Sequence, residues 1–182
     1  MVRYRRNFIP GGTFFFTLTL RDRASRLLVE HIDTLREAFR AARQRYPFAI
    51  DAIVVLPEHL HLLMTLPPDD AGYDSRIRYI KGRFSRRLAQ AGVPIHRDDR
   101  GGFDLWQRRY WEHTVRDDED LQCHVEYIHF NPVKHGHAVR AADWPHSSIH
   151  RYIRMGLVNE DWAFQAEEGT ASRELNFGER PS

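Results

Sequence analysis

The sequence predicts an α+β fold in which a central, mostly antiparallel sheet has helices on one face. Segments rich in β-branched and aromatic residues alternate along the chain with longer segments that repeat apolar residues at helical spacing. Two of the β-rich segments are separated only by a short link at Pro57-Glu58, which favours an antiparallel pair. At 182 residues the chain is long enough for one domain with a sizeable core.

The first half of the chain contains three predicted strands and one predicted helix. The strands are residues 13–20, 48–56 and 59–66, which are rich in β-forming residues and are bounded by proline or glycine. Between the first two strands, residues 27–46 are predicted to form a helix, which Pro47 ends. The apolar positions of this helix recur at helical spacing: Leu28, Ile32, Leu35, Phe39 and Ala42.

The second half of the chain continues the alternation with a helix, an extended segment or strand, a second helix and a short helix. These elements are expected at residues 75–91, 103–111, 117–130 and 147–155. Gly92 ends the first of these helices, and Pro132 limits the second. The resulting order, β-α-β-β-α-β-α with a C-terminal extension, is typical of a ferredoxin-like layer. We therefore expect a single domain over residues 1–162 and a polar tail over residues 163–182.

Composition restricts the classes of protein to which the chain can belong. No apolar run approaches membrane-spanning length, so we expect a soluble, cytoplasmic protein without a membrane partner. The single cysteine, Cys123, excludes an internal disulfide and a zinc site built from cysteines. Any bound metal must therefore be held by nitrogen and oxygen ligands. The formal net charge of +2 does not by itself indicate a nucleic-acid partner.

His59 and His61 are separated by one residue within an apolar segment. Alternate residues of a strand share a face, so the two imidazoles point the same way, about 6–7 Å apart along the backbone. That spacing suits two ligands that converge on one divalent metal. The alternative is a strand with two partly buried, hydrogen-bonded histidines. A hydrolase with three alternating histidines is excluded, because Leu63 occupies the third position.

Tyr127 and Asn131 are four residues apart in the predicted helix 117–130 and its continuation, so they lie on one helical face. The tyrosine is a candidate nucleophile, and the asparagine offers a carbonyl oxygen one turn away. Tyrosine is a poor nucleophile at its free pKa near 10, and a divalent cation compensates for this by polarising a phosphate. The alternative is that Tyr127 is a half-buried aromatic residue without a chemical role.

Two other polar groups receive structural interpretations. The acidic run 117–120 favours the positive end of the helix dipole and needs no functional role. His135 and His137 flank Gly136 outside any strand pattern, so we interpret them as surface-loop residues and not as metal ligands.

Basic residues in three parts of the chain are candidate DNA contacts. The predicted helix 75–91 has several basic side chains with no acid among them: Arg76, Arg78, Lys81, Arg83, Arg86 and Arg87. Phosphate contact explains such an accumulation of like charge, and an ordinary solvated face is the alternative. The N-terminal arm adds Arg3, Arg5 and Arg6. Arg108 and Arg109 have aromatic neighbours, as in proteins that bind single strands, although Trp106 and Trp111 are equally compatible with a core.

Taken in their order along the chain, these segments resemble the single-tyrosine HUH transposases. The resemblance is closest to their domesticated branch, the REP-associated tyrosine transposases. It is carried mainly by His59-Leu60-His61 and by the segment Tyr127–Lys134. The other matching segments are Tyr4–Arg6, Pro10–Thr13, Trp106–His113 and Asp143–Ser148, so the resemblance extends from residue 3 to about residue 162.

The resemblance implies a metal-dependent enzyme that cleaves and rejoins strands of DNA. Tyr127 would attack a phosphodiester of single-stranded DNA, which forms a 5′-phosphotyrosine link and a free 3′-hydroxyl without ATP. His59 and His61 would bind Mg²⁺ or Mn²⁺. Asn131 falls where relatives use a polar third ligand, often a glutamine, whose side chain is one methylene longer.

The resemblance also implies the DNA partner and the setting. The partner would be hairpin-forming repetitive DNA with imperfect palindromes, bound in single-stranded form by a monomer rather than a dimer, in the cytoplasm at the nucleoid. The alternative function is a catalytically silent hairpin-binding regulator of the same fold. The joint presence of His59, His61, Tyr127 and Asn131 argues against such a loss of catalysis.

Overall fold

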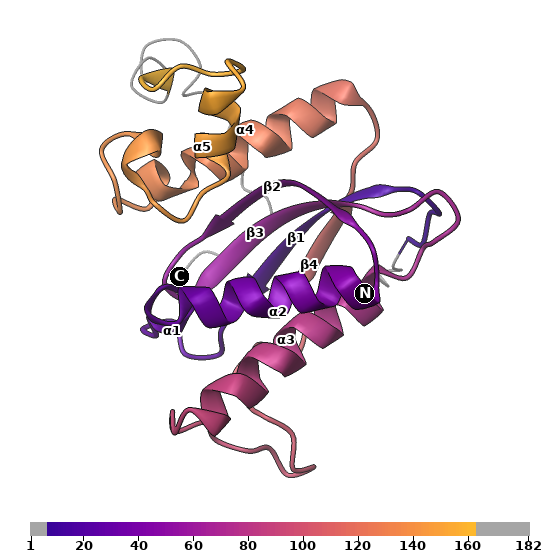
Figure 1. The fold of residues 1–182 in the computed structure, drawn as a ribbon, viewed down its shortest axis with the longest axis vertical. Coiled ribbons are helices and arrows are strands. Elements are labelled where there is room, and N and C mark those ends of the chain that lie inside the picture. The colour runs from indigo at the N-terminus through magenta and orange to yellow at the C-terminus, as the bar shows by residue number, and fades with distance from the viewer. Residues whose placement is uncertain (1–6, 163–182) are drawn as a thin grey trace, which may run out of the picture.

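The computed structural model describes residues 7–162, which form a four-stranded sheet with helices packed on both of its faces (Figure 1). The strands are β1 (Thr13–Thr19), β2 (Ala49–Val55), β3 (His59–Thr65) and β4 (Trp111–Thr114). They lie in the order β2-β3-β1-β4, and every neighbouring pair is antiparallel. The α+β class and the antiparallel sheet predicted from the sequence are therefore confirmed.

The long helices lie on opposite faces of this sheet. They are α2 (Ile32–Arg45), α3 (Tyr73–Gln90) and α4 (Asp118–Lys134). α2 and α3 pack with Phe14 and Phe16, whereas α4 packs on the other face with Phe15 and Leu63. The expectation that helices cover a single face is therefore wrong. The side chains of β1 and β3 are buried on both faces of the sheet, so helices cover both faces.

None of the helices within residues 7–162 combines the length and the apolar composition that crossing a membrane requires.

The helix predicted at residues 27–46 is divided at His31 into α1 (Leu27–Glu30) and α2. Its apolar positions nevertheless form one stripe, because Leu28, Leu35 and Phe39 all join the core that lies beneath α2 and α3.

The strand expected at residues 103–111 begins later than predicted. The chain first meets the end of β1 at an isolated bridge between Trp106 and Leu20, and it pairs with β1 again at Trp111, opposite Thr17. The offset between these two pairings means that two additional residues bulge out of the ladder before β4. Trp106 is 6% exposed and packs against Phe84, so its interpretation as a core residue is the correct one.

α4 continues through Pro132, although this proline was expected to limit the helix. A proline has no N–H group to donate to the carbonyl oxygen four residues earlier, which weakens a helix interior. In this helix Asn131 and Pro132 are both buried. The carbonyl oxygen of Pro132 accepts hydrogen bonds from the backbone N–H groups of His137 (2.8 Å) and Ala138 (3.3 Å) as the chain turns back. Tertiary packing therefore keeps the last turn helical as far as Lys134.

The chain after α4 covers the outer edge of β2. It passes through a 3₁₀ turn, η1 (Ala141–Asp143), and then forms α5 (Ile149–Arg154). Between them, the backbone N–H of Val55 donates to the carbonyl oxygen of His146 at 2.8 Å. The N–H of Ser148 donates to the carbonyl oxygen of Ile53, also at 2.8 Å. This short pairing protects an otherwise open sheet edge and ties the C-terminal part to the sheet.

Candidate functional site

His59 and His61 lie on the face of β3 that α4 covers. Their side chains are 2% and 0% exposed. The two ring centres are 5.0 Å apart, with the ring planes at 80° to each other. Both imidazoles are buried because α4 covers this face, while β2 and β1 flank β3 on its two edges. The shared face predicted from strand alternation is thus present, and it points at a helix.

A neighbouring side chain holds the Nδ1 atom of each histidine. Nδ1 of His59 lies 2.8 Å from Oε1 of Glu58, and Nδ1 of His61 lies 2.9 Å from Oγ1 of Thr17. Burial opposes ionisation of Glu58, but its hydrogen bond with His59 and the nearby charge of Arg23 lower the pKa of Glu58 below its usual value. A carboxylate on Nδ1 orients an imidazole so that its Nε2 lone pair is available to a metal.

One face of α4 lies opposite these histidines. Tyr127 and Asn131 lie one turn apart on this face, and His135, the residue directly after α4, follows one turn later. The ring of Tyr127 is 5.1 Å from that of His61, and the ring of His135 is 5.3 Å from that of His59. Asn131 is one turn from Tyr127 and one turn from His135. It therefore lies between the residues that contact His61 and His59. His135 is exposed in the turn after α4, as its interpretation as a surface-loop residue predicts, and the contact of its ring with His59 is an addition that the sequence did not reveal.

The fully buried polar atoms at this place fit a divalent metal. Among the described residues, Nε2 of His59 and both amide atoms of Asn131 are buried without a hydrogen-bond partner. Such atoms cost stability unless something else satisfies them. An imidazole nitrogen and an amide oxygen are both ligands for Mn²⁺, and the oxygen also suits Mg²⁺. These residues could therefore hold a divalent metal.

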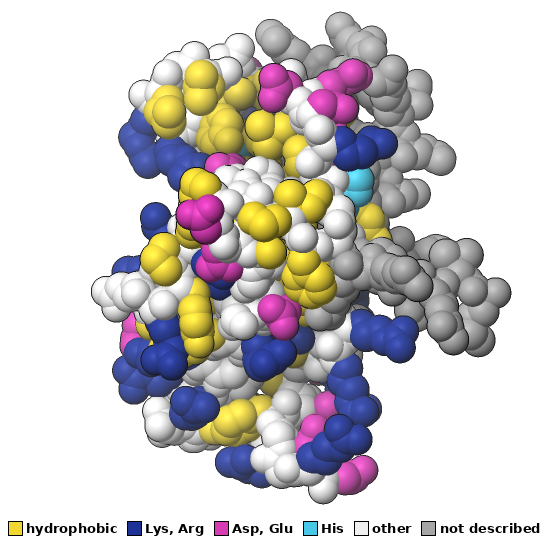
Figure 2. All heavy atoms as spheres, turned by 90° about the vertical axis from the view of Figure 1, so that its right-hand side faces the viewer, with side chains coloured by type: hydrophobic (Ala, Val, Ile, Leu, Met, Phe, Trp, Pro, Cys, Tyr) yellow, Lys and Arg dark blue, Asp and Glu magenta, His cyan; other side chains and the backbone are white. Residues whose placement is uncertain are grey.

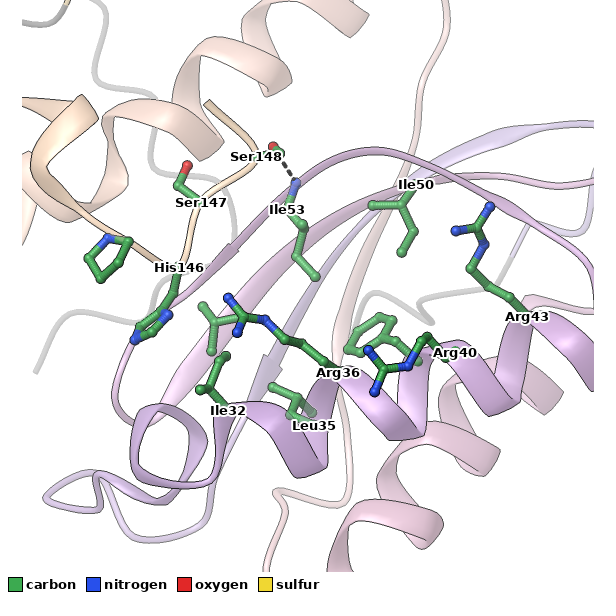
Figure 3. A pocket seen from close by; sticks show the side chains of 13 residues that line it. Ile32, Leu35, Arg36, Arg40, Arg43, Ile50, Ile53, His146, Ser147 and Ser148 are labelled. Carbon is green, nitrogen blue, oxygen red and sulfur yellow. Dashed lines mark hydrogen bonds between the residues drawn. The ribbon is translucent and has the colours of Figure 1, made fainter. Parts of the chain in front are cut away.

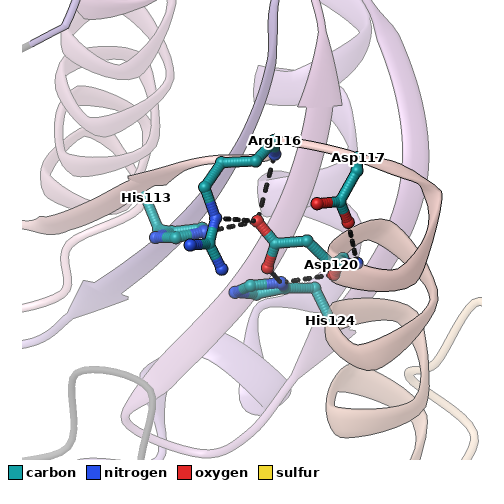
Figure 4. A network of polar contacts seen from close by, with 5 residues as sticks. All are labelled: His113, Arg116, Asp117, Asp120 and His124. Atoms are coloured by element: carbon teal, nitrogen blue, oxygen red, sulfur yellow. Dashed lines mark hydrogen bonds and ion pairs between the residues drawn. The ribbon is translucent and has the colours of Figure 1, made fainter.

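A second polar cluster joins β4 to the start of α4 (Figure 4). His113, Asp120 and His124 bring three potential metal-ligating atoms within 4.8 Å of one another. Oδ2 of Asp120 lies 2.8 Å from Nε2 of His113 and accepts hydrogen bonds from the backbone N–H (3.0 Å) and Nε (3.2 Å) of Arg116. Burial opposes its charge, yet these hydrogen bonds lower the pKa of Asp120 to about 2.

The acidic run at the start of α4 thus does more than complement the helix dipole. Asp117 caps the helix by accepting a hydrogen bond from the backbone N–H of Asp120 at 2.8 Å. The side chain of Asp120, however, turns inward to the two histidines. The only sequence signal for this cluster is the spacing of Asp120 and His124, which are one turn apart on the helix.

The two clusters are connected through Phe15. The Phe15 ring is 4.8 Å from the ring of His124 and 5.4 Å from the ring of His61. It also meets the ring of Tyr127 at 5.9 Å. The His113–Asp120–His124 cluster therefore lies behind the site of Tyr127 and His61, on the same face of the sheet.

Arg76, predicted to contact DNA, is instead a structural residue. Its side chain is 1% exposed although it lies on α3. Nη2 of Arg76 donates to Oδ2 of Asp70 and to the carbonyl oxygen of Pro47, both at 2.6 Å, and Nη1 donates to the carbonyl oxygen of Gly72 at 2.9 Å. The prediction was wrong because these partners lie in other loops, which helical spacing within residues 75–91 does not reveal.

The other basic residues of α3 are nearer to solvent but are not without acidic neighbours. Arg83 and Arg87 share Oε1 of Glu37 on α2, at 2.9 and 3.0 Å. Lys81 donates to the carbonyl oxygen of Gln107 at 2.8 Å and lies over the Trp106 ring. Arg86 is exposed. Figure 2 shows Lys and Arg side chains spread over the lower half of the molecule, where α3 lies.

The remaining predicted DNA contacts are Arg108, Arg109 and the N-terminal arm. Arg108 and Arg109 are exposed in the bulge that precedes β4. Arg3, Arg5 and Arg6 lie outside residues 7–162, the part of the chain that the structure describes.

Comparison with known proteins relates this site to a protein family. The family model described as "Transposase IS200 like" matches residues 13–131, which include His59, His61, Tyr127 and Asn131. The chain belongs to the IS200-like transposase family. Its relatives are thus enzymes of DNA transposition. The paired histidines and most of α4, including Tyr127, fall within the matched part.

Within the IS200-like transposases, the chain belongs to the REP-associated tyrosine transposases. The REP-associated tyrosine transposase of Escherichia coli (strain K12) is 41% identical over 175 residues, which cover 96% of this chain and 99% of the relative. A Haemophilus influenzae protein is 43% identical over 164 residues, which cover 89% of this chain and 93% of the relative. The solved structure of a REP-associated tyrosine transposase bound to a REP hairpin has a TM-score of 0.84 and 40% identity, covering 100% of this chain and 99% of that one.

Proposed function

We propose that this IS200-like transposase is a metal-dependent endonuclease and strand transferase for single-stranded, hairpin-forming repetitive DNA. Tyr127 is its nucleophile and forms a 5′-phosphotyrosine intermediate. The observation that carries the proposal is the contact between Tyr127 and His61 beside two groups of buried, unsatisfied ligand atoms, on His59 and Asn131.

His59, His61 and Asn131 would hold Mg²⁺ or Mn²⁺, and the metal would polarise the scissile phosphate and stabilise the charge that develops on it. We prefer this group to the His113–Asp120–His124 cluster as the metal site. In the second cluster the carboxylate of Asp120 already accepts several hydrogen bonds, and the Arg116 guanidinium, itself a cation, stands beside it. That cluster would instead keep Phe15 and the start of α4 in place behind the site.

The proposed reaction is a transfer of the phosphodiester from the 3′-oxygen to Tyr127. Oη of Tyr127 forms a bond to phosphorus as the bond from phosphorus to the 3′-oxygen breaks. The phenol gives up its proton, and the departing 3′-oxygen takes one up. The ammonium of Lys134 lies 5.0 Å from the centre of the Tyr127 ring and supplies positive charge close to the attacked phosphate. The 3′-hydroxyl can later attack the phosphotyrosine and rejoin the strands, so no ATP is consumed.

We propose a DNA hairpin as the partner, because the structural relative that aligns over the whole chain was solved with a REP hairpin. Phosphate contacts are assigned to basic residues of α3, of the bulge before β4 and of the N-terminal arm: Lys81, Arg83, Arg86, Arg87, Arg108, Arg109, Arg3, Arg5 and Arg6. A monomer suffices for cleavage in this proposal, since Tyr127 and the histidines belong to one chain. The protein would act at the nucleoid.

Incubation with a single-stranded DNA hairpin and Mn²⁺ tests the proposal. A protein–DNA adduct that resists denaturant is expected, and it should be absent in Tyr127→Phe and present in the control Tyr79→Phe on α3. His61→Ala should abolish cleavage while hairpin affinity stays within a few-fold of the parent. Hairpin binding without any adduct would contradict the enzymatic proposal and favour a silent hairpin-binding regulator. An equal collapse of binding in His61→Ala would make that histidine structural.

A further inference from the structure

A groove lies on the α3 side of the sheet, across the sheet from Tyr127 and the paired histidines. It has a volume of about 420 Å³ and runs between α3 and the segment 98–110, which leads to β4. Apolar and aromatic side chains form part of its lining: Ile77, Phe103, Trp106 and Tyr110. The groove therefore has the size and the aromatic lining of a pocket for a small organic ligand.

The indole of Trp106 brings an unsatisfied donor to this groove. Trp106 is 6% exposed, and its ring packs edge-on against Phe84 at 5.8 Å between the ring centres. Its Nε1 atom is buried and has no hydrogen-bond partner among the described residues. A buried tryptophan usually has a partner for its N–H group, because an unpaired buried donor costs stability. An acceptor atom of a ligand in the groove would supply that partner.

Lys81 and Arg108 bring positive charge to the groove. The ammonium of Lys81 donates to the carbonyl oxygen of Gln107 at 2.8 Å and lies 5.7 Å from the centre of the Trp106 ring. Arg108 lines the groove from the segment 98–110 and is exposed. A cationic group beside an aromatic wall suits a ligand that combines a planar ring with an anionic group.

Three aspartates line the same groove, and each already accepts hydrogen bonds from a neighbouring donor. The partners are Arg78 for Asp74, the backbone N–H groups of Arg100 and Gly102 for Asp98, and Arg21 for Asp104. These donors offset part of the negative charge, so one phosphate beside Lys81 is tolerated. A strand of DNA along the groove would bring several phosphates past the three acids, which favours a single nucleotide as the occupant.

Gly82 keeps the α3 side of the groove open. It lies in the interior of α3, where glycine is less favourable than alanine. A Cβ atom built at Gly82 would have no other atom within 4 Å. No contact among the described residues therefore requires a glycine at this position, whereas a ligand that lies against the helix would.

We infer that this groove binds a nucleoside monophosphate. The base lies on the aromatic side chains and accepts a hydrogen bond from Nε1 of Trp106. The phosphate binds the ammonium of Lys81, which exchanges the Gln107 carbonyl oxygen for a charged partner. The inference goes beyond the proposed function, since it involves neither Tyr127 nor a metal.

Calorimetric titration with ribonucleoside 5′-monophosphates, in EDTA and without DNA, tests the inference. At least one nucleotide should bind about tenfold more tightly than its nucleoside, ribose 5-phosphate or inorganic phosphate. In a proton–nitrogen correlation spectrum, the indole signal that Trp106→Phe removes should shift when the nucleotide binds. Equal binding of nucleotide and inorganic phosphate would overturn the inference, and so would an unchanged Trp106 signal.

Variants of the groove locate the nucleotide. Trp106→Phe removes only the N–H donor and should weaken binding about fivefold. Lys81→Met should weaken it about tenfold. Gly82→Leu fills the groove and should abolish binding, while urea unfolding shows a chain at least as stable as the parent, because leucine favours a helix more than glycine does. Parent-like nucleotide affinity in Gly82→Leu would contradict the inference.

Gln90→Leu and Arg40→Ala are the matched controls. Gln90 is exposed on α3 outside the groove. Arg40 is an exposed arginine of α2 that lines a different groove, beside the segment 145–148 (Figure 3). Both variants should bind the nucleotide like the parent. A loss in Arg40→Ala as large as that in Lys81→Met would indicate general attraction to positive charge and would refute a site at Trp106.

Hairpin binding with and without the nucleotide separates this inference from the proposed function. Lys81 and Arg108 are also assigned to DNA phosphates, so the nucleotide should raise the apparent Kd of the hairpin for the parent protein and not for Gly82→Leu. If the nucleotide binds at Trp106 and leaves hairpin affinity unchanged, the assignment of Lys81 and Arg108 to DNA is wrong and the nucleotide site stands. If no nucleotide binds while Mn²⁺ produces the Tyr127 adduct, the inference fails and the proposed function stands.

Discussion

The ring of Tyr127 lies 5.1 Å from the ring of His61, with the two planes at 68°. Tyr127 comes from α4 and His61 from β3 of the same chain, so one copy suffices to bring a phenol next to the paired imidazoles. The packing of α4 on Phe15 and Leu63 produces this contact. Any change that shifts α4 along the sheet would therefore separate the tyrosine from the histidines.

Glu58→Gln is expected to weaken Mn²⁺ binding about tenfold while the protein stays folded. The carboxylate of Glu58 orients His59 through its Nδ1, and partners of this kind typically contribute such factors to metal affinity. Titration calorimetry or electron paramagnetic resonance with Mn²⁺ measures the affinity. Glu30→Gln, an exposed glutamate on α1, is the control and should bind Mn²⁺ like the parent. Equal affinity for Glu58→Gln would exclude Glu58 as an orienting residue.

Asp120→Asn is expected to lower the free energy of unfolding at neutral pH by about 2 kcal/mol. The pKa of Asp120 is about 2 in the folded chain, whereas an unfolded aspartate titrates near 3.9. Because the folded pKa is the lower one, the stabilisation is complete above about pH 5 and is lost as the pH falls from about 4 towards 2. Urea unfolding of both proteins at several pH values measures the difference.

The control for this experiment is Asp118→Asn, which changes an exposed acid in the same helical turn. It should alter the stability by no more than about 0.5 kcal/mol. A difference between parent and Asp120→Asn that stays constant down to pH 3 would show that the charge of Asp120 does not stabilise the fold.

Arg76→Ala is expected to destabilise the protein by about 2–3 kcal/mol, because it removes a buried side chain together with its ion pair and hydrogen bonds. Its guanidinium joins α3 to the loops that contain Pro47 and Asp70. Thermal or urea unfolding measures the loss. Arg78→Ala, which truncates a side chain that is 79% exposed on the same helix, should remain close to the parent. Parent-like stability of Arg76→Ala would contradict the structural role.

Glu37→Gln is expected to strengthen DNA hairpin binding several-fold. Hydrogen bonds from Arg87 and Arg83 lower the pKa of Glu37, so the acid is charged at neutral pH and neutralises part of the α3 surface. Removing the charge of Glu37 leaves Arg83 and Arg87 without their acidic partner, so both can contact phosphate. Arg86→Ala, by contrast, should weaken binding and reduce the salt slope by about 0.7–0.9. Fluorescence anisotropy at several salt concentrations measures both. Unchanged affinity in both variants would exclude α3 as a DNA surface.

Much of the fold follows from local patterns in the sequence. Strand alternation places His59 and His61 on one face, and helical spacing places Tyr127 and Asn131 on another. These periodicities depend only on backbone geometry, so they are readable without knowledge of any contact. The proline and glycine boundaries of most elements are equally local, which is why the predicted and observed element orders agree.

The contacts between elements were decided by the tertiary structure alone. A helical or strand period states which residues share a face, but it does not state which faces meet. For this reason the burial of Arg76, the approach of His135 to His59 and the inward turn of Asp120 were not foreseen. By itself, the sequence determined that the imidazoles of His59 and His61 share one face of a strand. It also determined that Tyr127 and Asn131 share one face of a helix. Packing of the sheet between α2 and α3 on one side and α4 on the other decided that these two faces meet.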